Sequence, residues 1–214
     1  MTAAGLAPPQ GRLRAAARRV RRAPAAAGLA LALLAAGCDS VEERAEGHYL
    51  DGLELLEEGV PVKASLEFRN TVRLDEDHVG ANFELARFAE DRQNYSAAIA
   101  RYGKVVSLDA SHVEAHVRLA TLLLAFDRID EAVASTVAAA QLAPNDVDVV
   151  VLEGALALNL GELDRAREKA SRATELAPED GDVWLLLGAI SRREGDAGKA
   201  LAQVDEGLRR DPDN

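Results

Sequence analysis

The chain has 214 residues, of which 48% are apolar but only 4% are aromatic. This composition suits thin helix-on-helix packing better than one large globular core. All 36 acidic residues but only 19 of the 25 basic residues follow Cys38, the only cysteine, so this part of the chain carries a formal charge of −17. Nucleic acid is therefore excluded as a partner, because phosphate binding needs a basic surface.

Residues 1–37 differ from the rest of the chain, since they carry six arginines and no acidic residue. An uncharged run follows the arginines at residues 23–36. This run is shorter than the ~20 apolar residues that a membrane-spanning helix needs. A basic start, a short apolar run and small residues before a reactive side chain are typical of an export signal that is cleaved.

The end of this run, Leu34–Cys38 (LAAGC), resembles the lipobox of bacterial lipoproteins, although the usual leucine three places before the cysteine is an alanine here. The resemblance implies that residues 1–37 are a signal peptide that is removed, that Cys38 is lipidated, and that residues 38–44 form a short tether. We then expect a lipoprotein anchored in a membrane of the cell envelope and facing the periplasm, with inner and outer membrane both open. The alternatives are an uncleaved anchor and a soluble protein whose cysteine is buried.

Small residues recur with a period of 34 beyond the predicted tether. They form two columns, and each member of the first column precedes a member of the second by twelve residues. Two helices approach closely only where no large side chain lies between them, so the columns predict helix-packing contacts. The columns are Gly52, Ala86, Ala120, Gly154 and Gly188, and Ala64, Ala98, Ala132, Ala166 and Ala200.

Turn signals follow the same period. Glycine or polar residues lie in the middle of each unit, and Pro144, Pro178 and Pro212 close three of the units. Such residues are expected where one helix stops and the next begins, so each unit predicts two helices joined by a tight turn. The five units are residues 45–78, 79–112, 113–146, 147–180 and 181–214.

This pattern resembles the tetratricopeptide repeat over residues 45–214. The fifth unit carries the fullest signature of a first helix, which includes Trp184. Asp51 and Glu153 depart from the pattern, because each replaces the usual leucine. The resemblance implies an all-α fold, an α–α superhelix (solenoid) of five 34-residue tetratricopeptide repeats whose stacked pairs bury a continuous core.

The resemblance also implies a concave groove lined by the second, fifth, ninth and twelfth positions of each first helix. The second positions are mostly acidic here, and the others are mostly apolar. A helix or extended segment with apolar anchors and a basic flank fits such a groove. The alternative is that the apolar residues only pack neighbouring first helices together. The predicted groove residues are Tyr49, Leu53, Phe83, Arg87, Val117, Thr121, Leu124, Val151, Ala155, Leu158, Leu185, Ala189 and Arg192.

His112 and His116 are the best candidates for chemistry, because a helix brings residues four apart to one face. Their pattern is not the HExxH of zinc proteases, and no third ligand lies nearby in the sequence. The sequence also contains no GxxxxGK phosphate loop and no GxSxG nucleophile turn. We therefore expect no catalytic residue, no metal and no cofactor.

The expected function is a non-enzymatic scaffold, tethered to a membrane by lipid, that binds a peptide or partner protein in envelope assembly, secretion or exopolysaccharide export. The last predicted helix leaves Leu201, Val204 and Leu208 partly uncovered, whereas repeat arrays normally carry a polar cap. Self-association through this C-terminal repeat is therefore a further expectation. The alternatives are the N-terminal, non-catalytic part of a larger enzyme and a self-assembling structural element.

Overall fold

The computed structural model describes residues 40–211, and this part of the chain contains ten α-helices and no strand. The predicted all-α fold is confirmed. The predicted signal peptide and the lipid attachment at Cys38 lie outside the described residues, so both stay predictions. The helices are α2 (Val41–Glu57), α3 (Pro61–Leu74), α4 (Val79–Asp91), α5 (Tyr95–Leu108), α6 (Val113–Ala125), α7 (Ile129–Leu142), α8 (Val147–Asn159), α9 (Leu163–Leu176), α10 (Gly181–Arg193) and α11 (Ala197–Arg210).

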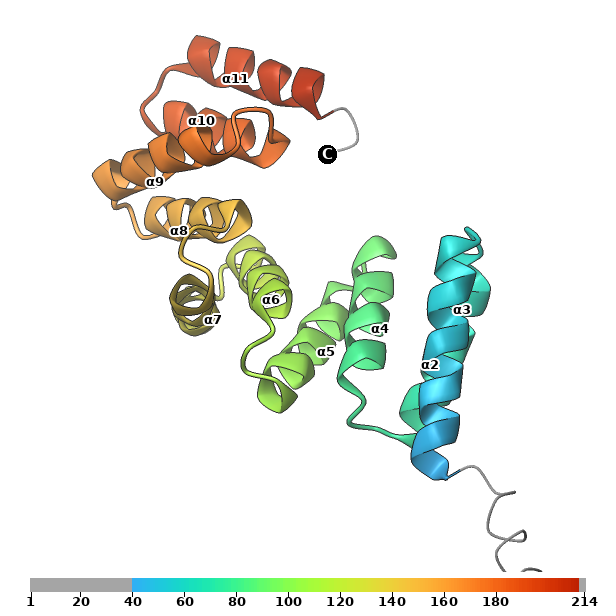
Figure 1. Cartoon of the computed structure of the whole chain (residues 1–214). Helices are drawn as coiled ribbons and strands as arrows, with labels where there is room; N and C mark the ends of the chain where they lie inside the picture. The colour runs from blue at the N-terminus through green and yellow to red at the C-terminus, as the bar shows by residue number, and fades with distance from the viewer. Residues whose placement is uncertain (1–39, 212–214) are drawn as a thin grey trace, which may run out of the picture. The chain divides into compact units, whose positions relative to one another are not determined.

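The helices form five pairs, from α2–α3 to α10–α11, and successive pairs stack into a curved row (Figure 1). The first helices of the last four pairs begin 34 residues apart, at Val79, Val113, Val147 and Gly181. The second helix of each pair contacts the first helix of the next pair, α6 also contacts α8, and α8 also contacts α10. The predicted solenoid of five repeats is therefore confirmed.

The first helix begins earlier than the sequence pattern suggests. Ser40 and Glu43 form a capping box, in which the Glu43 N–H donates to the Ser40 Oγ (3.0 Å) and the Ser40 N–H donates to the Glu43 carboxylate (2.7 Å). This reciprocal pair satisfies backbone donors that a helix start would otherwise leave open. Residues 41–44, which the sequence assigns to the tether, are therefore the first turn of α2.

The five pairs turn through the same hydrogen-bonded motif at the end of the first helix. After α2, the Gly59 N–H donates to the Leu56 carbonyl (3.0 Å) and the Val60 N–H donates to the Leu55 carbonyl (2.8 Å), which is a Schellman motif. The residue at the bend has a positive φ, which glycine adopts readily and other residues adopt at a cost. These residues are Gly59, Gln93, Asp127, Gly161 and Gly195.

Small residues allow the two helices of a pair to approach. The alanines of the second column are buried, and so are the small residues of the first column. A methyl group added at Gly52 would lie 2.5 Å from the Phe68 ring, and one added at Gly188 would lie 3.2 Å from the Ala200 carbonyl oxygen. An added side chain would displace Phe68 at Gly52 and crowd α11 at Gly188, so the 34-residue spacing of small residues marks where the helices meet.

One of the two departures from the repeat pattern forms an ion pair. Glu153 on α8 lies 2.7 Å from the ammonium of Lys169 on α9, and only 12% and 15% of these side chains are exposed. Because both charges are largely removed from water, each depends on the other. The pair therefore replaces the apolar contact that the usual leucine would make.

No helix in the described part of the chain is both long and apolar enough to cross a membrane.

The last helix of the array exposes apolar side chains. Helix α11 packs on α10 through Ala200 and Gly207, whereas Leu201 and Leu208 are 64% and 48% exposed. Self-association through this face stays a prediction.

The bend residues provide a test of the turn motif. We expect Gln93→Gly and Asp127→Gly each to raise the free energy of unfolding by about 0.5–1 kcal/mol, since glycine removes the cost of a positive φ. The gain should be larger at Gln93, because aspartate tolerates this conformation better. Urea unfolding followed by circular dichroism measures it, with Gly161→Gln as the opposite change. A stabilised Gly161→Gln variant would contradict the interpretation.

Candidate functional site

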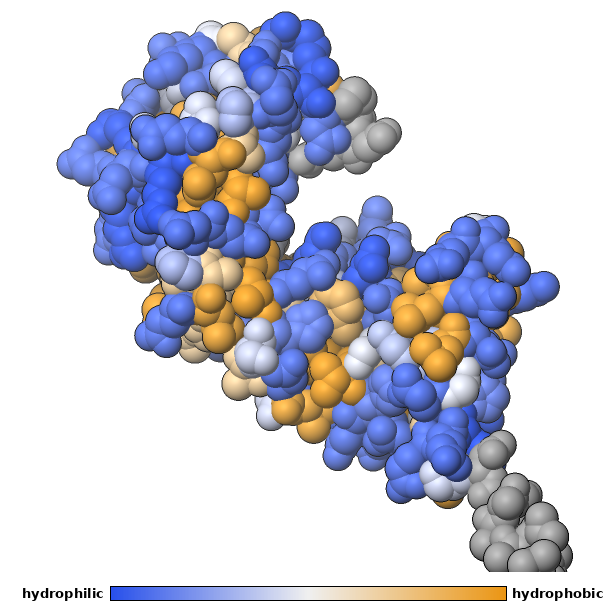
Figure 2. All heavy atoms as spheres, viewed as in Figure 1, coloured by the Kyte–Doolittle hydropathy of each residue, from blue (hydrophilic) through white to orange (hydrophobic). Residues whose placement is uncertain are grey.

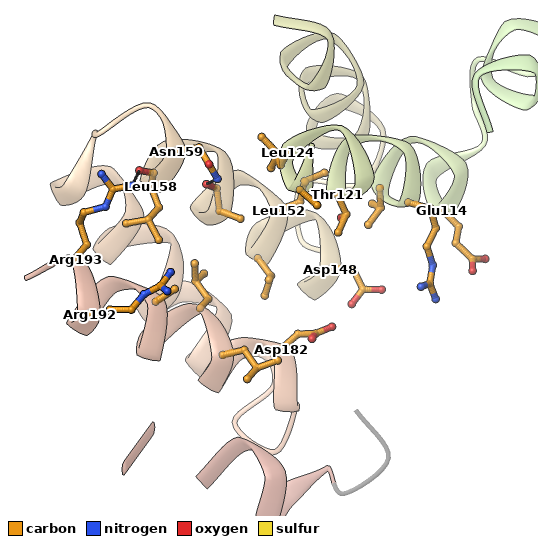
Figure 3. Close-up of a pocket in the computed structure, with 18 residues that line it drawn as sticks. Glu114, Thr121, Leu124, Asp148, Leu152, Leu158, Asn159, Asp182, Arg192 and Arg193 are labelled. Carbon is orange, nitrogen blue, oxygen red and sulfur yellow. Dashed lines mark hydrogen bonds between the residues drawn. The ribbon is translucent and has the colours of Figure 1, made fainter. Parts of the chain in front are cut away.

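A hollow of about 570 Å³ lies on α6, α8 and α10 (Figure 3), and we call it the α6–α10 groove. It is lined by the same six helix positions in each of the three helices, namely the second, fifth, sixth, ninth, twelfth and thirteenth of each repeat. It therefore extends across three consecutive repeats. The lining residues are Glu114, Val117, Arg118, Thr121, Leu124, Ala125, Asp148, Val151, Leu152, Ala155, Leu158, Asn159, Asp182, Leu185, Leu186, Ala189, Arg192 and Arg193.

Nine of the thirteen predicted groove residues line this hollow, so the structure brings them together. The sixth and thirteenth positions were not predicted as lining positions, although helical spacing places them beside the second and ninth. Of the residues at these positions, Arg118 and Arg193 matter most because they add positive charge. The nine are Val117, Thr121, Leu124, Val151, Ala155, Leu158, Leu185, Ala189 and Arg192.

The floor of the groove is apolar. Leu152, Leu158 and Leu186 are buried, and Val151 and Leu185 are half-buried. Val151 packs against the core clusters beneath it while also lining the groove. Such residues can both pack neighbouring first helices together and contact a partner, which were the two alternatives left open by the sequence. One face of the side chain joins the helices and the other remains accessible. Figure 2 shows apolar side chains exposed over this part of the array on a largely hydrophilic visible face.

One end of the groove is acidic. Glu114, Asp148 and Asp182 lie in the first turns of α6, α8 and α10, where the positive ends of the helix dipoles favour negative charge. Burial raises the pKa of Asp148 above its ordinary value, and neighbouring carboxylates raise it further, whereas Arg118 lowers it. Those carboxylates belong to Asp146, Asp180 and Asp182.

Two of these carboxylates also begin helices. The Asp146 and Asp180 side chains are the N-caps of α8 and α10, and each accepts a backbone N–H two residues on at 2.9 Å. Their positions are therefore fixed by the helices that they cap. The acidic end is consequently a preformed concentration of negative charge that suits a cationic group.

The opposite end of the groove is basic. Arg192 and Arg193 lie in the last turn of α10, and Figure 3 places them at the end of the groove farthest from Glu114. An Arg193 N–H donates to the Leu158 carbonyl (3.4 Å), while Arg192 is exposed. A guanidinium can bind a carboxylate through two parallel hydrogen bonds, so this end suits an anionic group.

The structure places the other four predicted residues outside the groove. Tyr49 and Leu53 pack on the cluster of Phe68 in the first pair. Phe83 is buried, with ring centroids 5.7 Å from Tyr102 and 4.6 Å from His112. Phe83 therefore lies within the core, whereas Tyr49 is half-buried against it.

Arg87 lines a separate hollow of about 230 Å³ together with Tyr95, and it pairs with Glu84 (3.4 Å). Glu90 lines the same hollow and accepts the hydroxyl of Tyr102 (2.8 Å). Burial, followed by this bond, raises the pKa of Tyr102. The predicted groove residue Arg87 is therefore part of a separate, polar site on α4.

The two histidines noted in the sequence do not converge. His112 is the N-cap of α6, and its Nδ1 accepts the Ala115 N–H (3.2 Å). His116 is buried, and its Nε2 lies 3.2 Å from the Ala110 carbonyl oxygen. His78 caps α4 in the same way as His112 caps α6. His78 and His112 therefore act as helix caps, whereas the buried Nδ1 of His116 has no hydrogen-bond partner within the described part of the chain.

A different set of residues could hold a metal. Among the described residues, His48, Asp51 and Glu67 place one ligand atom each within 4.8 Å of the others. They come from α2 and α3, far along the chain from the α6–α10 groove.

Two family models of the tetratricopeptide repeat match the sequence, at residues 89–149 and 151–214, which together exceed half of the chain. The comparison with curated proteins finds no match. Similar solved structures include MamA (residues 41 to the end) from Desulfovibrio magneticus RS-1, at 20% identity over 81% of this chain and 98% of that chain, with a TM-score of 0.64.

Pseudomonas aeruginosa PilF is similar at 20% identity over 81% of this chain and 79% of that chain, with a TM-score of 0.61. YrrB, described as a protein of this repeat class with an unusual peptide-binding site, is similar at 18% identity over 86% of this chain and 93% of that chain, with a TM-score of 0.61. At these identities the structures show a shared fold. With five helix pairs at a step of 34 residues and two matching repeat models, the chain belongs to the tetratricopeptide-repeat family.

Proposed function

We propose that this chain is a membrane-tethered scaffold whose α6–α10 groove binds a segment of a partner protein. The observation that carries the proposal is the order of chemistry along the groove, with carboxylates at one end, an apolar floor and guanidinium groups at the other. Membership of a repeat family that typically has no catalytic role supports it. The peptide-binding site named for YrrB is a property of that protein and a precedent for this fold.

The chemistry of the groove defines the segment. Lysine or arginine would lie against Asp148 and Asp182, apolar side chains over Val151 and Leu185, and an acidic residue against Arg192. The thirteen residues of α8 span about 20 Å at 1.5 Å per residue. An extended segment of about six residues, or a helix of about thirteen, covers that length.

The side chains of the groove favour binding over reaction. Its polar members are carboxylates and guanidinium groups, together with Thr121 and Asn159, and no histidine or cysteine lines it. Nucleophilic catalysis usually pairs a nucleophile with an adjacent general base in hydrogen-bond reach. We therefore propose a scaffold rather than an enzyme, working at the periplasmic face of an envelope membrane in assembly, secretion or exopolysaccharide export.

The groove can be tested with fluorescent peptides that carry lysines at one end, leucines in the middle and glutamates at the other. Thr121→Arg puts a bulky cation on an exposed part of the groove. It should raise the dissociation constant at least about tenfold, a loss of ~1.4 kcal/mol in binding free energy. Val137→Arg is the matched control, because Val137 is exposed on α7 and does not line the groove. Fluorescence polarisation gives both constants, and equal binding by the two variants would refute the proposal.

Binding should also depend on pH through Asp148. Its raised pKa means that it takes up a proton at a higher pH than an ordinary aspartate, whose pKa is about 3.9. A lysine at the acidic end favours the ionised form, so affinity should be highest near neutral pH and fall as the pH is lowered through the raised pKa. Asp148→Asn should show a shallower dependence in polarisation titrations at constant ionic strength. An unchanged slope in this variant would exclude Asp148 as the group responsible.

The proposed tether has its own test. In a bacterial host the native chain should incorporate labelled fatty acid and remain with membranes until detergent is added, because two or more acyl chains are needed for stable anchoring. Cys38→Ser should lose the label and move to the soluble fraction. Gly47→Ser serves as a control for expression, since Gly47 is exposed on α2 and has open space around it. Labelled and membrane-bound Cys38→Ser protein would rule out this attachment site.

A further inference from the structure

The first helix pair holds a set of metal-ligating side chains that the groove does not use. His48 and Asp51 lie three residues apart on α2, and Glu67 lies opposite them on α3. The His48 Nδ1 and the Glu67 Oε2 are 2.7 Å apart, and one ligand atom from each of the three residues lies within 4.8 Å of the others. Two helices therefore present one imidazole and two carboxylates to a common point.

The repeat architecture supplies an internal comparison for this cluster. Three repeats further along, Glu153 stands at the position of Asp51 and Lys169 stands at the position of Glu67. There the carboxylate and the ammonium form an ion pair at 2.7 Å. In the first pair the ammonium is replaced by a second carboxylate, so the same contact between the helices brings together two groups of like charge.

The third residue of the cluster also differs between the two pairs. The position of His48 is taken by Val150 in the α8–α9 pair, and Val150 is fully buried. The first pair thus has an imidazole where its counterpart has an apolar side chain. Two carboxylates that face each other are stabilised by a shared cation, and the added imidazole supplies a nitrogen ligand for it.

The donor set indicates the class of cation. Magnesium and calcium prefer sites made of oxygen alone, whereas a site of imidazole nitrogen and carboxylate oxygen suits Zn²⁺ and its neighbours among the transition metals. Asn70 also donates to the Glu67 Oε2 (3.1 Å), which orients this carboxylate as outer partners of metal ligands do.

We propose that His48, Asp51 and Glu67 together bind one divalent transition-metal ion of the Zn²⁺ class, which joins α2 to α3. The ion would occupy the role that the Lys169 ammonium has beside Glu153. Among the described residues the first pair has a neighbouring pair on one side only, and terminal repeats are the least supported members of such arrays. The metal site would hold together the pair nearest the predicted membrane anchor, and it does not depend on the α6–α10 groove.

Cobalt is the probe for the experiment, because its visible absorption reports nitrogen and oxygen ligands and Zn²⁺ displaces it. The full chain is purified without a histidine tag and carries Cys38→Ser, which removes its only thiol. We expect a saturable absorption with one Co²⁺ per chain, loss of that signal on addition of Zn²⁺, and a higher melting temperature with Zn²⁺ but not with Mg²⁺. No saturable signal would overturn the proposal.

Two variants separate the site from adventitious binding. Loss of an outer partner of a metal site costs about 10–100-fold in affinity, so loss of a ligand in Asp51→Asn should weaken Co²⁺ binding by at least about tenfold. Glu67→Lys recreates the ion pair of the fourth repeat, so it should fold without metal, as judged by circular dichroism, and lose the effect of Zn²⁺ on melting. His112→Gln is the control and should bind as the parent does. Parental affinity in either cluster variant would overturn the proposal.

Discussion

The close approach of two helices within each pair is the constraint on which the rest of this structure depends. At Gly52 an added methyl group would clash with the Phe68 ring, and at Gly188 it would lie unusually close to the Ala200 carbonyl oxygen. The alanines of the second column are buried. Each contact fixes the crossing point of one pair. Because the contacts recur every 34 residues without an insertion, each helix pair stacks on the next through the same elements in the same order.

The groove is a consequence of this regularity. Identical spacing means that a given position of α6, α8 and α10 faces the same direction, so six positions from three helices form one continuous lining. A single insertion between Ala132 and Ala166 would rotate the later helices and divide the floor. The groove residues are thus positioned by the small residues at the helix contacts, such as Gly154, which lies against Leu186.

Periodicity made the fold readable from the sequence, because small residues and turns repeat at an interval that only one kind of architecture produces. The same register located nine groove residues in the last three repeats. It could not place Phe83, because whether a side chain faces solvent or the core depends on its size and its neighbours rather than on its position number. The cluster at His48 and Glu67 was equally hidden, since the two residues are nineteen positions apart and meet only when α2 packs on α3.

The residues that begin the first helices change in kind along the array. His78 and His112 cap α4 and α6 with a ring nitrogen, whereas Asp146 and Asp180 cap α8 and α10 with a carboxylate at the same register. The helix caps beside the acidic end of the α6–α10 groove are therefore carboxylates, whereas those of the two preceding first helices are imidazoles. Charges act over about 8 Å at physiological ionic strength, so the Asp146 and Asp180 carboxylates would attract the cationic end of a segment before it made contact. Local caps, needed in the first place for helix stability, would thereby also set the direction in which a partner approaches.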